Sequence, residues 1–162
     1  MLSKGLTGGY LPLSLVVTTQ EIYDAFYCDY SEKKGFLHSH SYTGNPLACT
    51  AANATLDIFE QHNILEKNID TSKKIGERLE NLAQFNIVKN IRQKGVVGAF
   101  EIDGFDVEKR VGMKIYTKML DRGVLLRPLG NTVYFMPPYI IKDSEIDFVF
   151  DNLESVLKVL DI

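Results

Sequence analysis

The chain has 162 residues, of which 45% are hydrophobic and 24% charged, and this composition fits one globular domain or one and a half. The net charge of −3 comes without a basic cluster, so the composition gives no electrostatic sign of nucleic-acid binding. No apolar run is long enough to span a membrane and no signal-peptide pattern opens the chain, so we expect a soluble cytoplasmic protein.

The first notable feature is a single lysine among small residues. Lys4 is followed by Gly5 and then by Thr7-Gly8-Gly9, ahead of an apolar run. Glycines allow tight turns and close approach of the backbone to a bound group. An amine held in such a pocket can form a Schiff base with a carbonyl, and burial can lower its pKa. The alternative interpretation is a solvated lysine near the chain terminus.

The apolar run within residues 11–18 is typical of a buried strand. The sequence Thr18-Thr19-Gln20-Glu21 fits a capping box and predicts a helix directly after it. Residues 28–44 lack periodicity and carry aromatic, hydroxyl and histidine side chains. Long irregular segments of this kind are often functional loops, so we expect one here.

The irregular segment leads into a clear helix start. Asn45 suits the N-cap and Pro46 the first helical position, and the hydroxyl-rich residues just before them suit a phosphate, as does a helix N-terminus. His38 and His40 could be a metal pair, but nothing nearby completes a site, so we predict structural histidines. The two cysteines of the chain, Cys28 and Cys49, lack metal-ligand spacing, so we predict that they are free thiols.

The pattern of the second half of the chain predicts a compact α+β unit. Its predicted elements are a helix over 64–82, strands over 86–92 and 95–102, a helix over 107–122, strands over 124–126 and 132–135 joined by a turn at 127–131, and a final helix from Asp143. An arginine at a strand end beside a Pro/Gly turn, such as Arg127, can be held rigid and bind a carboxylate through two hydrogen bonds. The alternative is a structural ion pair with one of the 21 acidic residues.

Three stretches together resemble the class III aminotransferases, which are pyridoxal-phosphate enzymes of fold type I. They are the lysine segment 1–14, the helix start Gly44-Asn45-Pro46-Leu47-Ala48-Cys49, and the later run from Arg127-Pro128-Leu129-Gly130 to Met136-Pro137-Pro138-Tyr139-Ile140-Ile141. The last two are much more specific than the first. The resemblance covers the whole chain, with its motifs in the family's order.

This resemblance implies an α/β fold and a particular division of the chain. Residues 1–62 are expected to be the C-terminal part of the large cofactor domain, 63–83 a connecting helix, and 84–162 the small C-terminal α+β domain. The match is to the C-terminal portion of the family. The family's acid that pairs with the pyridine nitrogen, its phosphate cup and its stacking aromatic lie upstream of that portion and have no counterpart in these residues.

The resemblance also implies roles for four residues and no metal. Lys4 is expected to be the catalytic lysine that forms the Schiff base with pyridoxal 5'-phosphate, and Ser41 to contact the cofactor phosphate across a homodimer interface. Arg127 is expected to bind the carboxylate of a keto acid substrate, and Tyr134 to line the active site. The loop Ser39-His40-Ser41-Tyr42-Thr43 departs from the commoner Gly-Pro-Thr-Phe-Met version, but serine in place of threonine keeps the hydroxyl.

The run that starts at Arg127 resembles in particular the branch of the family that serves biotin biosynthesis. That likeness implies amino transfer from S-adenosylmethionine to 8-amino-7-oxononanoate, which gives 7,8-diaminononanoate. Two alternatives stay open. One is another class III aminotransferase acting on an omega-amino acid such as ornithine or 4-aminobutyrate. The other is a non-catalytic chain that pairs with a separately supplied N-terminal half.

Overall fold

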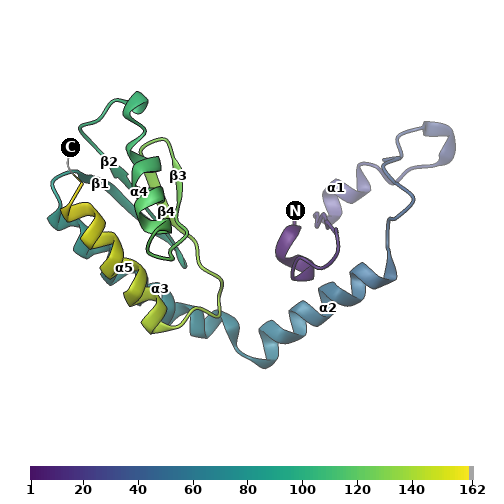
Figure 1. Cartoon of the computed structure of the whole chain (residues 1–162). Helices are drawn as coiled ribbons and strands as arrows, with labels where there is room; N and C mark the ends of the chain where they lie inside the picture. Colours follow the sequence, from purple (N-terminus) through teal and green to yellow (C-terminus); the bar gives the residue numbers. More distant parts are fainter. Residues whose placement is uncertain (161–162) are drawn as a thin grey trace. The chain divides into compact units, whose positions relative to one another are not determined.

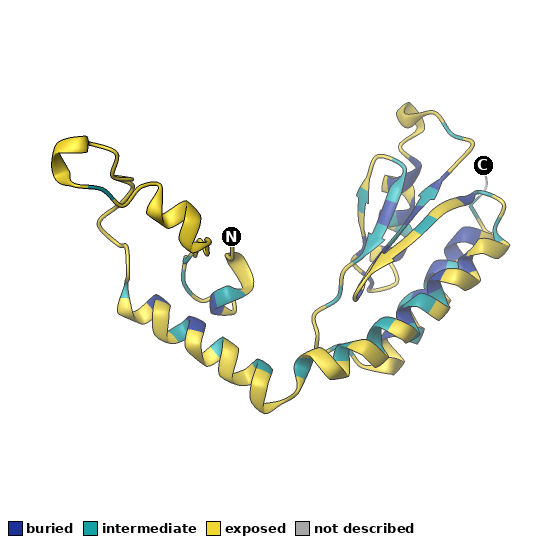
Figure 2. Cartoon of the chain, turned by 180° about the vertical axis from the view of Figure 1, so that it is seen from behind, coloured by how far each residue is buried: buried dark blue, intermediate teal, exposed yellow. Residues whose placement is uncertain are grey.

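The computed structural model describes residues 1–160, and the chain divides into two compact units, Met1–Asn63 and Ile64–Ile162 (Figure 1). The last two residues of the predicted 84–162 domain lie outside the described part. The two units differ sharply in burial: the second contains a continuous apolar core, whereas the first leaves most of its apolar side chains exposed (Figure 2).

The first unit consists of three short helical segments and one long helix, and the first of the short segments packs on the long helix. Its elements are the 3₁₀ turn η1 (Lys4–Thr7), helix α1 (Gln20–Asp24), the 3₁₀ turn η2 (Tyr30–Glu32) and helix α2 (Pro46–Gln61). The predicted start of α2 is confirmed, because the Asn45 side chain accepts the Leu47 N–H at 3.0 Å. The N-cap of α1 is Thr19, one residue later than the capping box suggested, and its hydroxyl accepts the Ile22 N–H at 3.4 Å.

The buried strand predicted within residues 11–18 is wrong. Val16 and Val17 are 67% and 71% exposed, and this segment's one ladder contact is the antiparallel bridge between Leu2 and Leu15. A strand needs a neighbour along its length to accept and donate its backbone hydrogen bonds. Within residues 1–160 no strand lies beside this segment, so its apolar composition does not produce a strand.

The second unit is an antiparallel sheet covered by helices, in agreement with the predicted α+β pattern. Its elements are α3 (Ile64–Asn81), η3 (Leu82–Gln84), β1 (Val88–Lys94), β2 (Val97–Ile102), η4 (Val107–Lys109), α4 (Val111–Leu120), β3 (Arg127–Leu129), β4 (Thr132–Phe135) and α5 (Asp143–Lys158). The strand order is β1-β2-β4-β3, and every neighbouring pair is antiparallel.

The core lies between one face of this sheet and the three long helices. Along β2, Gly98, Phe100 and Ile102 are buried, whereas Val97, Ala99 and Glu101 alternate with them on the other face. Helix α3 packs on β1 and β2, α4 packs on β3, and α5 packs on both helices. The helices contribute deeply buried side chains to this core, among them Ile75, Leu79, Ile115, Met119, Ile146, Phe150 and Leu153.

Two predicted boundaries in this unit are wrong. The strand expected at 124–126 lies instead at Arg127–Leu129, and a two-residue connection, Gly130-Asn131, replaces the predicted five-residue turn. Gly130 has φ 60°, which suits such a hairpin. The helix expected over 107–122 is divided at Arg110, whose φ of 49° interrupts helical geometry between η4 and α4. Pro128 is tolerated in β3 because β3 is an edge strand.

Gly112 in α4 sets how closely this helix approaches the β3–β4 hairpin. A Cβ at Gly112 would lie 2.3 Å from the Gly130 carbonyl oxygen and 2.9 Å from the Pro128 Cβ. Both neighbours belong to the hairpin that carries Arg127, so any larger residue must displace it.

We therefore predict that Gly112→Ala destabilises the protein by about 1–3 kcal/mol, because the hairpin backbone has to shift. Urea denaturation measures the effect. The matched control is Gly76→Ala in α3. There the new Cβ would meet Gln93 Oε1 at 2.6 Å, but this is the end of a flexible side chain that can move away, and alanine favours the helix by about 1 kcal/mol. Equal losses in the two variants would contradict the prediction.

Candidate functional site

Lys4 occupies the first position of η1 in an unusual backbone conformation. Its φ is 54°, in the left-handed region that residues with a Cβ rarely adopt, and it is exposed. Leu2 and Leu15 exchange two backbone hydrogen bonds of 2.8 Å, which close the loop that contains Lys4. Such imposed conformations concentrate at functional sites. Within the part of the chain that the structure describes, no side chain pairs with the Lys4 amine.

Ser41 lies in the turn directly before α2. The Thr43 N–H donates to the His40 carbonyl at 3.0 Å, and the Thr43 hydroxyl accepts the His40 N–H at 3.2 Å. These two bonds hold the turn, and the Asn45 cap follows it. Ser41 is exposed, and its hydroxyl has no hydrogen-bond partner among the described residues. It is therefore free to bind an anion at the approach to a 16-residue helix.

Arg127 and Tyr134 face each other across the β3–β4 pair. They are direct register partners, so their Cβ atoms lie about 4.5–5.5 Å apart on the same face of the sheet. Tyr134 also pairs with Ala99 of β2, and Ala99 pairs with Arg92 of β1. One row of side chains thus crosses all four strands. We call the face that carries this row, opposite the helices, the open face; it bears Arg92, Ala99, Glu101, Arg127, Thr132 and Tyr134.

The two arginines of this row have different surroundings. Arg92 Nη1 donates to Glu101 Oε1 at 2.8 Å, so its charge is already paired. Arg127 is exposed, and its guanidinium has no ion pair or side-chain hydrogen bond with any of residues 1–160. The alternative that Arg127 forms a structural ion pair is therefore not what the structure shows. A free guanidinium beside a tyrosine can bind a carboxylate ligand.

The structure brings two of the four predicted site residues together. Arg127 and Tyr134 share a row in the second unit. Lys4 and Ser41 belong to the first unit, on separate segments, and no hydrogen bond joins them in the described chain.

Two neighbours of these residues were not singled out from the sequence. Ala99 lies next to Tyr134 on the open face and leaves space there. The predicted strand over 95–102 includes Ala99, but only the strand pairing puts it beside Tyr134. Thr7 is buried at the end of η1, and no pattern in the sequence marks a lone threonine for burial.

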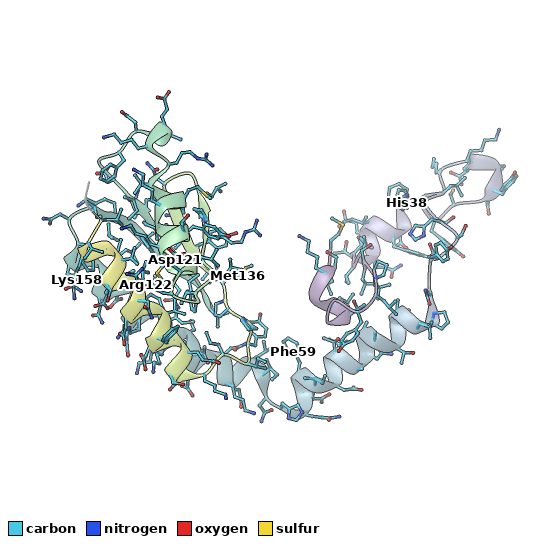
Figure 3. All side chains as sticks on the ribbon, viewed as in Figure 1. His38, Phe59, Asp121, Arg122, Met136 and Lys158 are labelled. Carbon is cyan, nitrogen blue, oxygen red and sulfur yellow. The ribbon has the colours of Figure 1, made fainter. Side chains whose placement is uncertain are left out.

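The next feature is the loop that carries His38 and His40. His38, which Figure 3 labels, lies beside Phe36 with ring centroids 5.6 Å apart. Among the described residues, no group of three His, Cys, Asp or Glu side chains could hold a metal ion. Cys28 and Cys49 are free thiols. None of the helices in the described chain is long and apolar enough to cross a membrane.

Comparison with known proteins identifies a single family along almost the whole chain. The family model for aminotransferase class-III matches residues 1–157. The chain is 49% identical to the adenosylmethionine-8-amino-7-oxononanoate aminotransferase of Helicobacter pylori, over 98% of this chain and 37% of that protein. The chain thus spans little more than a third of the length of this curated relative.

Solved structures show the same likeness in three dimensions. The crystal structure of adenosylmethionine-8-amino-7-oxononanoate aminotransferase from Methanocaldococcus jannaschii superposes with a TM-score of 0.91 at 36% identity, over 99% of this chain and 38% of that one. A PMP-bound form of an aminotransferase from Vibrio fluvialis gives a TM-score of 0.86 at 27% identity, over 96% of this chain and 36% of that one. The predicted α/β fold is confirmed by these superpositions.

The pairing of Glu101 with Asn90 and Arg92 predicts that the stability of the protein depends on pH. The hydrogen bond from Asn90 Nδ2 to Glu101 at 2.7 Å, helped by Arg92, holds the pKa of the Glu101 carboxyl below its usual range. A lowered pKa in the folded state means that the stabilisation is present at neutral pH and is lost as the pH falls through that pKa. We expect Glu101→Gln to be less stable than the parent near neutral pH, and the difference to shrink as the pH falls through the ordinary range of a glutamate carboxyl and below it. Urea titrations at several pH values measure it, and a difference independent of pH would disprove the assignment.

Proposed function

Because the chain belongs to the class III aminotransferase family, we propose that it acts in transferring an amino group from S-adenosylmethionine to 8-amino-7-oxononanoate, giving 7,8-diaminononanoate for biotin synthesis. The observation that carries this proposal is the unpaired Arg127 guanidinium facing Tyr134 on the open face. The keto acid ends in a carboxylate, and a guanidinium with no partner of its own in the described chain is suited to bind it.

The surroundings of Arg127 suit the rest of this substrate. Leu129 lies two residues along the same strand, on the same face, and is 76% exposed. An exposed leucine beside a free guanidinium matches a molecule with a carboxylate at the end of a methylene chain. Tyr134 offers a hydroxyl and an aromatic face on the other side of Arg127. We infer that these three side chains orient the acid end of the keto acid.

Lys4 and Ser41 suit the aldehyde and the phosphate of pyridoxal 5'-phosphate, respectively. Lys4 offers a primary amine with no ion-pair partner among residues 1–160, and Ser41 offers a hydroxyl with none. Lys4 would hold the aldehyde carbon of the cofactor through its amine, and Ser41 would hold its phosphate. When bound, pyridoxal phosphate supplies an electron sink for negative charge at the carbon that bears the amino group.

In the proposed reaction Lys4 moves a proton. With the cofactor bound, the Lys4 Nζ would take the proton from the substrate carbon that bears the amino group and would give it to the cofactor carbon on the other side of that nitrogen. A general base for this step needs a pKa near the working pH. The left-handed backbone of Lys4 supports this role, because such conformations are kept mainly at functional sites.

Two further parts of the proposal concern assembly and location. We include a homodimer in which Ser41 of one subunit bonds the cofactor phosphate held by the other. The exposed Ser41 turn supports this, because a hydroxyl presented to the outside of its own unit is available to a second copy. A cytoplasmic location is also proposed, as expected for the biosynthesis of a vitamin.

Lys4→Ala should abolish covalent capture of pyridoxal phosphate, because the amine that condenses with its aldehyde is removed. Borohydride reduction followed by digestion and mass spectrometry detects the tag on the lysine peptide. Lys33→Ala is the matched control, since Lys33 is an exposed lysine of the same unit with the same φ of 54°. A tag that persists in Lys4→Ala would remove Lys4 from this role.

Arg127→Ala should raise the KM for 8-amino-7-oxononanoate by about tenfold or more, because a charge-assisted carboxylate contact is lost. The KM for S-adenosylmethionine should change much less. The matched control is Arg92→Ala, which removes a charge from the same row that is already paired with Glu101 and should leave the keto acid KM near the parent value.

The same steady-state assay decides which member of the family this is. Turnover with S-adenosylmethionine as donor supports the proposal, whereas a preference for ornithine or 4-aminobutyrate favours another class III aminotransferase. Equal keto acid KM values in the parent and in Arg127→Ala would make Arg127 structural.

A further inference from the structure

Thr7 is the one buried polar residue among the described residues, with 1% of its surface exposed. This burial is notable because the first unit leaves most of its apolar side chains exposed, and only Ala48 and Ala52 in that unit are also buried. A buried hydroxyl is tolerated only when its hydrogen bonds are made.

The Thr7 hydroxyl makes both of its bonds to one residue. Its Oγ1 donates to the Leu11 carbonyl at 2.5 Å and accepts the Leu11 N–H at 3.4 Å. The Thr7 carbonyl accepts the Tyr10 N–H at 3.2 Å. These bonds close residues 7–11 into a compact turn whose geometry depends on the side chain of Thr7. We call this turn the threonine clamp.

The threonine clamp rests on helix α2. Ala48, Ala52 and Thr55 lie at helical spacing on one face of α2, where η1 packs. A Cβ at Gly8 would lie 3.6 Å from the Thr55 hydroxyl oxygen, so the chain just after Thr7 lies against this face. The small alanine side chains let the turn approach the helix closely, and this contact buries Thr7.

Lys4 is held between two closures of the same loop. On its N-terminal side Leu2 and Leu15 exchange backbone hydrogen bonds, and on its C-terminal side Thr7 ends η1 and forms the clamp. Within η1 the Leu6 N–H donates to the Ser3 carbonyl at 3.2 Å. A lysine does not adopt φ 54° by preference, so its surroundings must impose this conformation. The nearest side-chain interaction that can do so is the threonine clamp.

We propose that Thr7 is a positioning residue for Lys4: its buried hydroxyl closes the 7–11 turn on α2 and thereby holds the lysine backbone in the conformation that aims the amine. The inference rests on the proposed role of Lys4 as the lysine that binds pyridoxal phosphate. Thr7 itself touches neither substrate nor cofactor in this proposal and acts only through the backbone of η1.

The test uses the complete natural polypeptide that carries this sequence, with pyridoxal phosphate as the probe. Thr7→Val keeps the shape of the side chain but removes the hydroxyl. We expect the cofactor concentration for half-maximal borohydride capture at Lys4 to rise about tenfold, because the hydrogen bonds that hold the clamp are lost. Amide hydrogen exchange of residues 5–11 should become faster, while exchange in β2 reports whether the variant is otherwise folded. Thr7→Ser should restore both readouts to near the parent values.

The matched control is Thr55→Val. The Thr55 hydroxyl lies on the supporting face of α2 but donates to the Ala51 carbonyl of its own helix at 2.9 Å, so its loss should leave capture unchanged. The proposal would be overturned if Thr55→Val reduced capture at Lys4 as much as Thr7→Val does. It would also be overturned if Thr7→Ser reduced capture as much as Thr7→Val does. Normal capture in Thr7→Val overturns this inference alone. A parent protein that gives no capture at Lys4 overturns the proposed function, and this inference with it.

Discussion

The alternation of side chains across the four-stranded sheet is the constraint on which the second unit depends. Residues that point to one face build the core, as Phe100 and Val133 do, and their neighbours must then point to the other face. Arg127 and Tyr134 are opposite each other because Val133 is buried and Pro128 pairs with it. The open face with its free guanidinium is therefore a consequence of the same register that forms the core.

The first unit is held by other means. It has no core comparable to that of the second unit, and the conformation of its lysine segment depends on a backbone pair, one buried threonine and two alanines of α2. Such local hydrogen bonding can impose an unusual backbone conformation, as at Lys4, without burying much apolar surface. The two units thus illustrate two ways of holding a candidate functional side chain: by strand register, and by closure of a short loop.

Charge has different uses at different places in the second unit. Between α3 and α5, Lys74 and Arg78 pair with acidic residues, and the hydrogen bond to Asp147 raises the pKa of Lys74. On the sheet, Arg92 pairs with Glu101. Arg127 has no such partner within residues 1–160, and this difference in surroundings, not the residue type, makes it the candidate for ligand binding.

The sequence alone determined the elements whose signals are local. Neighbouring residues predicted the Asn45-Pro46 helix start, helices α3 and α5, strand β2 and the resemblance of the three motifs to one family. Only the tertiary structure decided features that depend on distant partners. The strand at Arg127–Leu129 follows from pairing with β4, the exposure of Val16 and Val17 from the lack of a neighbouring strand in the described chain, and the burial of Thr7 from the face of α2. Helix caps and periodicity act over a few residues, whereas register, burial and backbone strain are set by contacts between segments far apart in the chain.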